Sequence, residues 1–101
     1  MAVVARISAD GHTVRIQVSG RFDFATHGEF RGAYRETDGA ATSFVVDLKD
    51  ADYLDSSALG MLLLLRDHAG ASRVGVAIEG ANRTVASILR VANFDRLFDV
   101  R

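Results

Sequence analysis

The residue types best able to do chemistry gather in segment 52–60, where Asp55, Ser56 and Ser57 stand directly before an apolar run. Hydroxyl and carboxylate oxygens at such a place satisfy the free N–H groups of a helix start. A hydroxyl at a helix N-terminus is also well placed to carry a phosphate, because those N–H groups and the positive end of the helix dipole stabilise an anion. The segment therefore predicts either a plain helix cap or a phosphorylation site.

A nucleophilic serine would need a base, and His12, His27 and His68 are the candidates. The nucleophile-elbow pattern G-x-S-x-G is absent, since Leu54 and Ala58 flank the serines where it needs glycines. The predicted strands and helices place His12 at the end of the sheet opposite the serines, and His68 near the far end of the helix that follows them. Only His27 stays on the same side, beside a helix start. We therefore expect a protein that is not an enzyme.

Metal and nucleotide sites are not indicated. Asp47, Asp50, Asp52 and Asp55 form an acidic run, but the calcium-loop pattern is missing and neither His nor Cys accompanies the run. A solvated acidic loop is the expectation. Neither glycine-rich phosphate-binding pattern occurs, so the expected cofactors and metals are none.

Net charge and hydropathy reduce the classes of partner that the sequence predicts. Twelve basic residues against thirteen acidic ones leave a formal charge of −1, which gives no broad reason to bind nucleic acid or an anionic membrane. The longest apolar run is 58–65, whereas a membrane-spanning helix needs about 20 residues. The first residues do not resemble a secretory signal. The expected location is cytoplasmic.

The length of 101 residues predicts one domain spanning 1–101, and two hydrophobic periods alternate along it. Residues 2–9 and 12–19 alternate in apolar and polar type across Asp10-Gly11, which predicts an antiparallel hairpin. Thr26 and Glu29 fit a capping box at the start of a helix. The further expected elements are a helix stop at Gly39, a buried strand over 44–48, a helix over 58–68, a strand over 74–78, a helix over 85–92 capped by Asn82, and a turn with an edge strand over 94–100.

This order predicts an α/β fold: an N-terminal hairpin followed by alternating helices and strands, with a mixed four- to five-stranded sheet. Sites in such sheets lie outside the carboxyl ends of the strands, which here points to loops 20–26, 49–57 and 80–83. The expected core comprises Phe44, Val46, Leu48, Leu59, Leu62, Val76, Ile78, Ile88 and Leu89.

Two blocks of sequence resemble a known family. Segment 55–60, Asp-Ser-Ser-Ala-Leu-Gly after a buried strand, is similar to the signature of the STAS domain in bacterial anti-sigma factor antagonists. Segment 20–26 is similar to that family's Gly-x-hydrophobic-Asp-x-x-Thr loop. One departure is Ala58, where many members have Gly. Alanine favours the helix by up to about 1 kcal/mol and leaves the serines in place.

The resemblance implies partner switching. The unphosphorylated antagonist binds an anti-sigma factor or a serine protein kinase. Phosphorylation of Ser56 weakens the complex, and a serine phosphatase reverses it. The resemblance assigns partner-binding or supporting roles to Asp23, Thr26, Asp55, Ser57, Leu59 and Gly60, and we expect a monomer when the protein is free. The alternative is a STAS subunit of a transporter or lipid-trafficking complex that is not phosphorylated.

Overall fold

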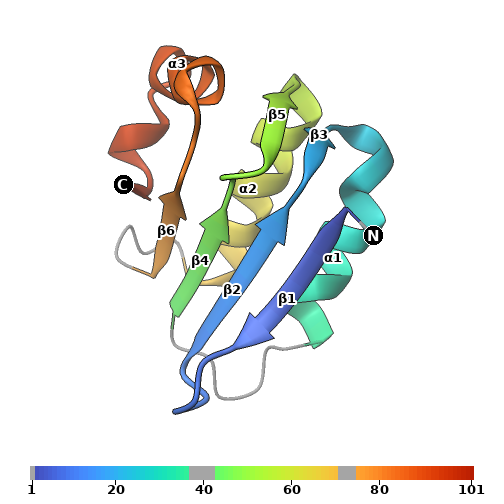
Figure 1. Cartoon of the computed structure of the whole chain (residues 1–101). Coiled ribbons are helices and arrows are strands. Elements are labelled where there is room, and N and C mark those ends of the chain that lie inside the picture. The colour runs from blue at the N-terminus through green and yellow to red at the C-terminus, as the bar shows by residue number, and fades with distance from the viewer. Residues whose placement is uncertain (1, 37–42, 71–74) are drawn as a thin grey trace.

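A five-stranded mixed sheet forms the centre of the computed structural model, which describes residues 2–36, 43–70 and 75–101 (Figure 1). The strands follow the order β1-β2-β4-β6-β7 across the sheet. Their bounds are β1 Val3–Ile7, β2 Thr13–Val18, β4 Ser43–Asp47, β6 Val76–Glu79 and β7 Asp99–Val100. β1 pairs with β2 in the antiparallel sense and the other neighbours are parallel. The predicted α/β class with a mixed sheet is confirmed.

The predicted hairpin is present, with Gly11 in the turn at a φ of 78°. Glycine takes this left-handed conformation without the steric cost that a Cβ brings. The predicted edge strand at the C-terminus is β7, which pairs with β6 after a 3-10 turn over Phe94–Arg96. The predicted helix stop at Gly39 and the first residue of the predicted strand 74–78 lie outside the described residues.

Two short strands were not predicted. β3 (Gly20–Phe22) and β5 (Ala51–Leu54) pair in parallel as a separate two-stranded sheet within segments expected to be loops. Their register shifts between Gly20 and Arg21, and only the two ends of β5 are buried. Strands this short and irregular leave no period-2 pattern in the sequence.

The described residues also form three α-helices: α1 (His27–Glu36), α2 (Ser56–His68) and α3 (Arg83–Val91). Figure 1 shows α1 and α2 side by side behind the sheet, with α3 beyond the end of β6. Asn82 caps α3 as predicted, because its side-chain oxygen accepts a hydrogen bond from the N–H of Val85 at 2.9 Å. The sheet face in front of α1 and α2 carries no helix among the described residues.

Most of the predicted core is buried. Seven of its nine members are buried, whereas Leu59 and Ile88 are half-buried and pack against the core from its margin. α2 buries Leu62 and Leu65 completely and leaves Leu63 and Leu64 exposed. Three phenylalanines complete the core with fully buried rings: Phe22, Phe30 and Phe98.

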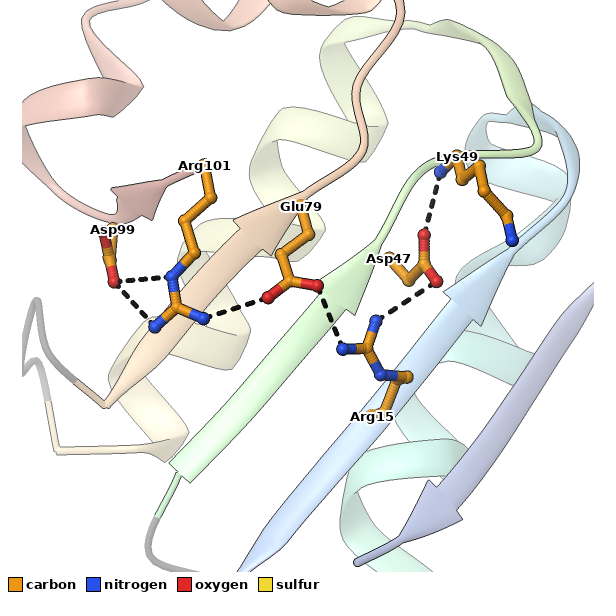
Figure 2. A network of polar contacts seen from close by, with 6 residues as sticks. All are labelled: Arg15, Asp47, Lys49, Glu79, Asp99 and Arg101. Carbon is orange, nitrogen blue, oxygen red and sulfur yellow. Dashed lines mark hydrogen bonds and ion pairs between the residues drawn. The ribbon is translucent and has the colours of Figure 1, made fainter.

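A ladder of ion pairs crosses the helix-free face of the sheet (Figure 2). Arg15 contacts Asp47 at 3.2 Å and Glu79 at 2.9 Å, and Arg101 contacts Glu79 and Asp99 at 2.9 Å each. Asp99 and then Glu79 raise the pKa of Arg101. Ion pairs this exposed are screened by water and add little to the stability of the fold, so the ladder aligns the strands more than it stabilises them.

Candidate functional site

The pairing of β3 with β5 brings two of the predicted site segments together. Phe22 lies opposite Leu54, and the backbone N–H of Asp55 donates to the carbonyl of Phe22 at 3.3 Å. Asp23 and Ser56 are the next residues of the two segments. The structure therefore places the two blocks that carry the family resemblance at one edge of the fold.

Asp55 begins α2. Its backbone is extended, and its carboxylate accepts a hydrogen bond from the N–H of Ala58 at 2.8 Å. The helix therefore starts at Ser56, two residues earlier than predicted, because the carboxylate satisfies the N–H that would otherwise be free. Ser56 is exposed on the first turn, and Ser57 behind it is half-buried. Asp55 is therefore the residue that caps the helix. Because the cap does not use Ser56, the Ser56 hydroxyl stays accessible.

The capping box predicted for Thr26 and Glu29 is wrong. A 3-10 turn over Phe24–Thr26 precedes α1, and its cap is Asp23, whose carboxylate accepts from the N–H of Ala25 at 3.0 Å. Thr26 is buried, and its hydroxyl donates to the carbonyl of Asp23 at 2.7 Å. Thr26 thus holds the Asp23 loop in shape from inside.

An aromatic surface surrounds these residues, and sequence reasoning missed it. Phe24 is 65% exposed and stacks on the ring of His27 at 4.5 Å between centroids. Tyr53 is 38% exposed, and the guanidinium of Arg21 lies 4.7 Å from its ring centroid. The sequence does place aromatic residues in the predicted loops. Aromatic residues are more often buried than exposed, however, so their type alone did not indicate an exposed surface.

The charges at this edge are mostly negative. Arg21 lies 3.6 Å from the Asp23 carboxylate, and Asp52 and Asp55 follow on the neighbouring segment. The Nδ1 of His27 lies 2.8 Å from the carbonyl of Phe24, and the hydrogen bonds among the described residues include none from His27 to Ser56 or Ser57.

The other two predicted site residues on α2 are placed differently. Leu59 is half-buried and packs against the core, so it supports the first turn of the helix. A Cβ on Gly60 would meet nothing within 4 Å, so packing does not require glycine there.

The third predicted loop, 80–83, joins the same edge. The Asn82 side chain donates to the carbonyl of Ala51 at 3.1 Å, which connects the start of α3 to β5. Gly80 has a φ of 76°, and a Cβ there would lie 3.1 Å from the Cβ of Lys49. Both the backbone conformation and this close approach require glycine.

Within residues 2–36, 43–70 and 75–101 there is no cluster of three or more metal-ligating side chains. The helices described there include none long and apolar enough to cross a membrane.

Comparison with known proteins agrees with this architecture. The family model described as "Mlab, STAS domain" matches residues 5–99. The chain belongs to the STAS-domain family. It is 49% identical over 100 residues to a STAS-domain containing protein of Pseudomonas aeruginosa (strain UCBPP-PA14), covering 99% of each chain.

Solved STAS structures share the fold at low identity. The unphosphorylated form of the anti-sigma factor antagonist SpoIIAA superposes with a TM-score of 0.70 at 18% identity, over 94% of this chain and 96% of that one. An anti-sigma factor antagonist from Mycobacterium paratuberculosis gives 0.75 at 16% identity, over 97% and 84%. Anti-sigma factor antagonists are therefore among the structural neighbours of this STAS domain.

Proposed function

We propose that this STAS domain is an anti-sigma factor antagonist that works by partner switching. Unphosphorylated, it binds an anti-sigma factor, a serine protein kinase, or one protein that is both. Phosphorylation of Ser56 releases that partner, and a serine phosphatase restores binding. The chain itself catalyses no reaction in this scheme.

The observation that carries the proposal is the position of Ser56. Its side chain is exposed at the first position of a 13-residue helix whose cap is the neighbouring Asp55. A kinase can reach the Ser56 hydroxyl. Substitution of Ser56 by alanine would leave the helix cap in place, because that cap is the carboxylate of Asp55. Free N–H groups of the first turn favour a phosphate there by roughly 0.3–1 kcal/mol.

Phosphorylation of Ser56 would strongly change the affinity for a partner, because other negative charges lie nearby. A phosphoserine adds about −1.5 to −2 charges beside Asp23 and Asp55. A partner surface complementary to a neutral hydroxyl would have to desolvate this added charge. A 100-fold loss of affinity needs only about 2.7 kcal/mol, which a mismatched buried charge can supply.

Affinity capture from native lysate, with and without ATP, tests the proposal. The captured protein is titrated with wild type, phosphorylated wild type, Ser56→Ala and Ser56→Asp, and the phosphosite is mapped by mass spectrometry. We expect phosphate on Ser56, wild-type affinity for Ser56→Ala, and weaker binding of Ser56→Asp and the phosphorylated protein. Ser57→Ala is the matched control and should still be phosphorylated.

Phosphate on another residue alone, or equal affinity of all four forms, would overturn the switch. A permease or transport ATPase as the captured protein, with no phosphate on Ser56, would favour the alternative of a permanent STAS subunit.

A further inference from the structure

A shallow groove lies between the C-terminal halves of α1 and α2, away from the proposed phosphorylation site. Arg31, Tyr34 and Arg35 line it from α1, Leu64 and His68 line it from α2, and its volume is about 410 Å³. A helix rises 1.5 Å per residue, so Leu64 and His68 lie roughly 12 and 18 Å along α2 from Ser56. The groove is therefore a separate surface.

The bottom of the groove is formed by the rings of His68 and Tyr34, which pack against the buried core. The ring of His68 lies 4.8 Å from that of Tyr34 and 6.1 Å from that of Phe44, measured between centroids. Tyr34 and Phe44 belong to the buried core. Leu64 stands beside the bottom of the groove with 59% of its surface exposed, although the same helix buries Leu62 and Leu65 completely. An aliphatic side chain placed on Leu64 would remove apolar surface from water.

The rim of the groove is positively charged. Arg31 and Arg35 are exposed and lie one helical turn apart, so their Cβ atoms are about 5–6 Å from each other. Neither forms an ion pair with a side chain that the structure describes, and the described residues that line the groove include no acidic one. Arg15 and Arg101 on the sheet face, by contrast, each contact two carboxylates. The groove is thus a positive site on a chain whose net charge is −1.

We propose that this groove binds an acidic segment of a protein partner. One aliphatic side chain of the segment lies on Leu64, and two carboxylates one helical turn apart pair with Arg31 and Arg35. Planar guanidinium groups bind carboxylates through two parallel hydrogen bonds, and arginine is enriched at protein interfaces. Because Ser56 is distant, a partner held here stays bound whether or not Ser56 is phosphorylated.

Titration of the isotope-labelled full chain by NMR tests this. The probe is a synthetic helical peptide with one leucine flanked by glutamates one turn apart, and its control carries lysines in place of the glutamates. We expect shifts at residues 31–35 and 64–68 with the glutamate peptide below about 1 mM, weakening as salt is added. The lysine peptide should cause none.

Variants make the test specific. Arg31→Glu with Arg35→Glu should weaken binding at least about tenfold, because attraction becomes repulsion. Arg83→Glu with Arg90→Glu changes the net charge equally at exposed positions on α3 and should leave the affinity unchanged. Ser56→Asp should also bind the peptide as wild type does, which separates this proposal from the phosphorylation switch.

The proposal is overturned if the glutamate peptide causes no shifts, or if both arginine pairs matter equally. It is also overturned if inorganic phosphate alone gives the same shifts with the same affinity. Binding to phosphatidylglycerol vesicles that requires Arg31 and Arg35, without peptide binding, would assign the groove to a lipid surface instead.

Discussion

The backbone N–H of Asp55 donates a hydrogen bond to the carbonyl of Phe22 at 3.3 Å. This single bond continues the pairing of β3 with β5 up to the first turn of α2. It sets Asp23 and Ser56 on adjoining segments, and it makes the start of α2 depend on the end of β3. This contact between the two segments is made by backbone atoms, so substitution of the site side chains does not remove it directly.

Asp55→Ala should destabilise the fold while leaving Ser56 accessible. The change removes the 2.8 Å cap on the N–H of Ala58, and loss of such a cap costs about 1 kcal/mol. Urea unfolding followed by circular dichroism measures the difference. Ser57→Ala, in the same turn, is the control and should cost clearly less. Equal costs for the two variants would contradict the assignment of Asp55 as the cap.

Asp23→Ala should impair phosphorylation of Ser56 or partner binding, with the thermal midpoint nearly unchanged. Asp23 is half-buried and caps only the three-residue turn Phe24–Thr26, so its contribution to the stability of the fold is small. Kinase assays and titration of the captured partner measure the effect. Asp95→Ala on the second 3-10 turn is the control. If the main result is a large loss of stability, Asp23 is structural and the site assignment fails.

Phe24→Ser and Tyr53→Ser should each weaken partner binding by about tenfold or more without lowering stability. Aromatic side chains are enriched at protein interfaces, and tyrosine is among the residue types that most often dominate the binding energy. Isothermal titration measures the affinity and thermal unfolding the stability. Val91→Ser is the control, because Val91 is 81% exposed on α3. Unchanged affinity in both aromatic variants would place the partner on another surface.

Asp10 should make the hairpin sensitive to acid. The Ser8 hydroxyl, and then the N–H of His12, donate hydrogen bonds to the Asp10 carboxylate and lower its pKa. Because the pKa of Asp10 is lower in the folded state than in the unfolded state, ionised Asp10 stabilises the fold at pH values above its unfolded pKa. That contribution is lost as pH falls through the folded value. The urea midpoints of wild type and Asp10→Ala should therefore differ more at pH 6 than at pH 3. A constant difference would contradict the linkage.

Much of the fold could be predicted from the sequence, because long regular elements leave regular patterns. The alternation of Val14, Ile16 and Val18 indicated β2, and all three side chains are fully buried. Strand order also predicted that loops 20–26, 49–57 and 80–83 lie at the carboxyl edge of the sheet. The pairing of β3 with β5 and the hydrogen bond from Asn82 to Ala51 bring these segments together. The start of α2 was placed too late, since Asp55 and the serines are all good capping residues and only geometry distinguishes them.

The rest depends on contacts between distant segments. Neither β3 nor β5 is long enough to show a period, so their pairing could not be predicted. Phe24 looks like a core residue by type, and its exposure depends on the turn that Asp23 caps. Arg31 and Arg35 form no ion pair with the side chains that the structure describes, and this too depends on which carboxylates the fold brings near them.

The separate two-stranded sheet has a consequence for motion. β3 and β5 pair with each other and not with the five strands of the main sheet, and the chain passes from β2 to β3 through Gly20 at a φ of 73°. Small hydrogen-bonded units of this kind open locally at a lower free energy than the core of a sheet. Backbone amides in 20–22 and 51–54 should therefore exchange with deuterium faster than those in β2 and β4. A partner that holds both segments would suppress this local opening, so slower exchange there would report occupancy of the site.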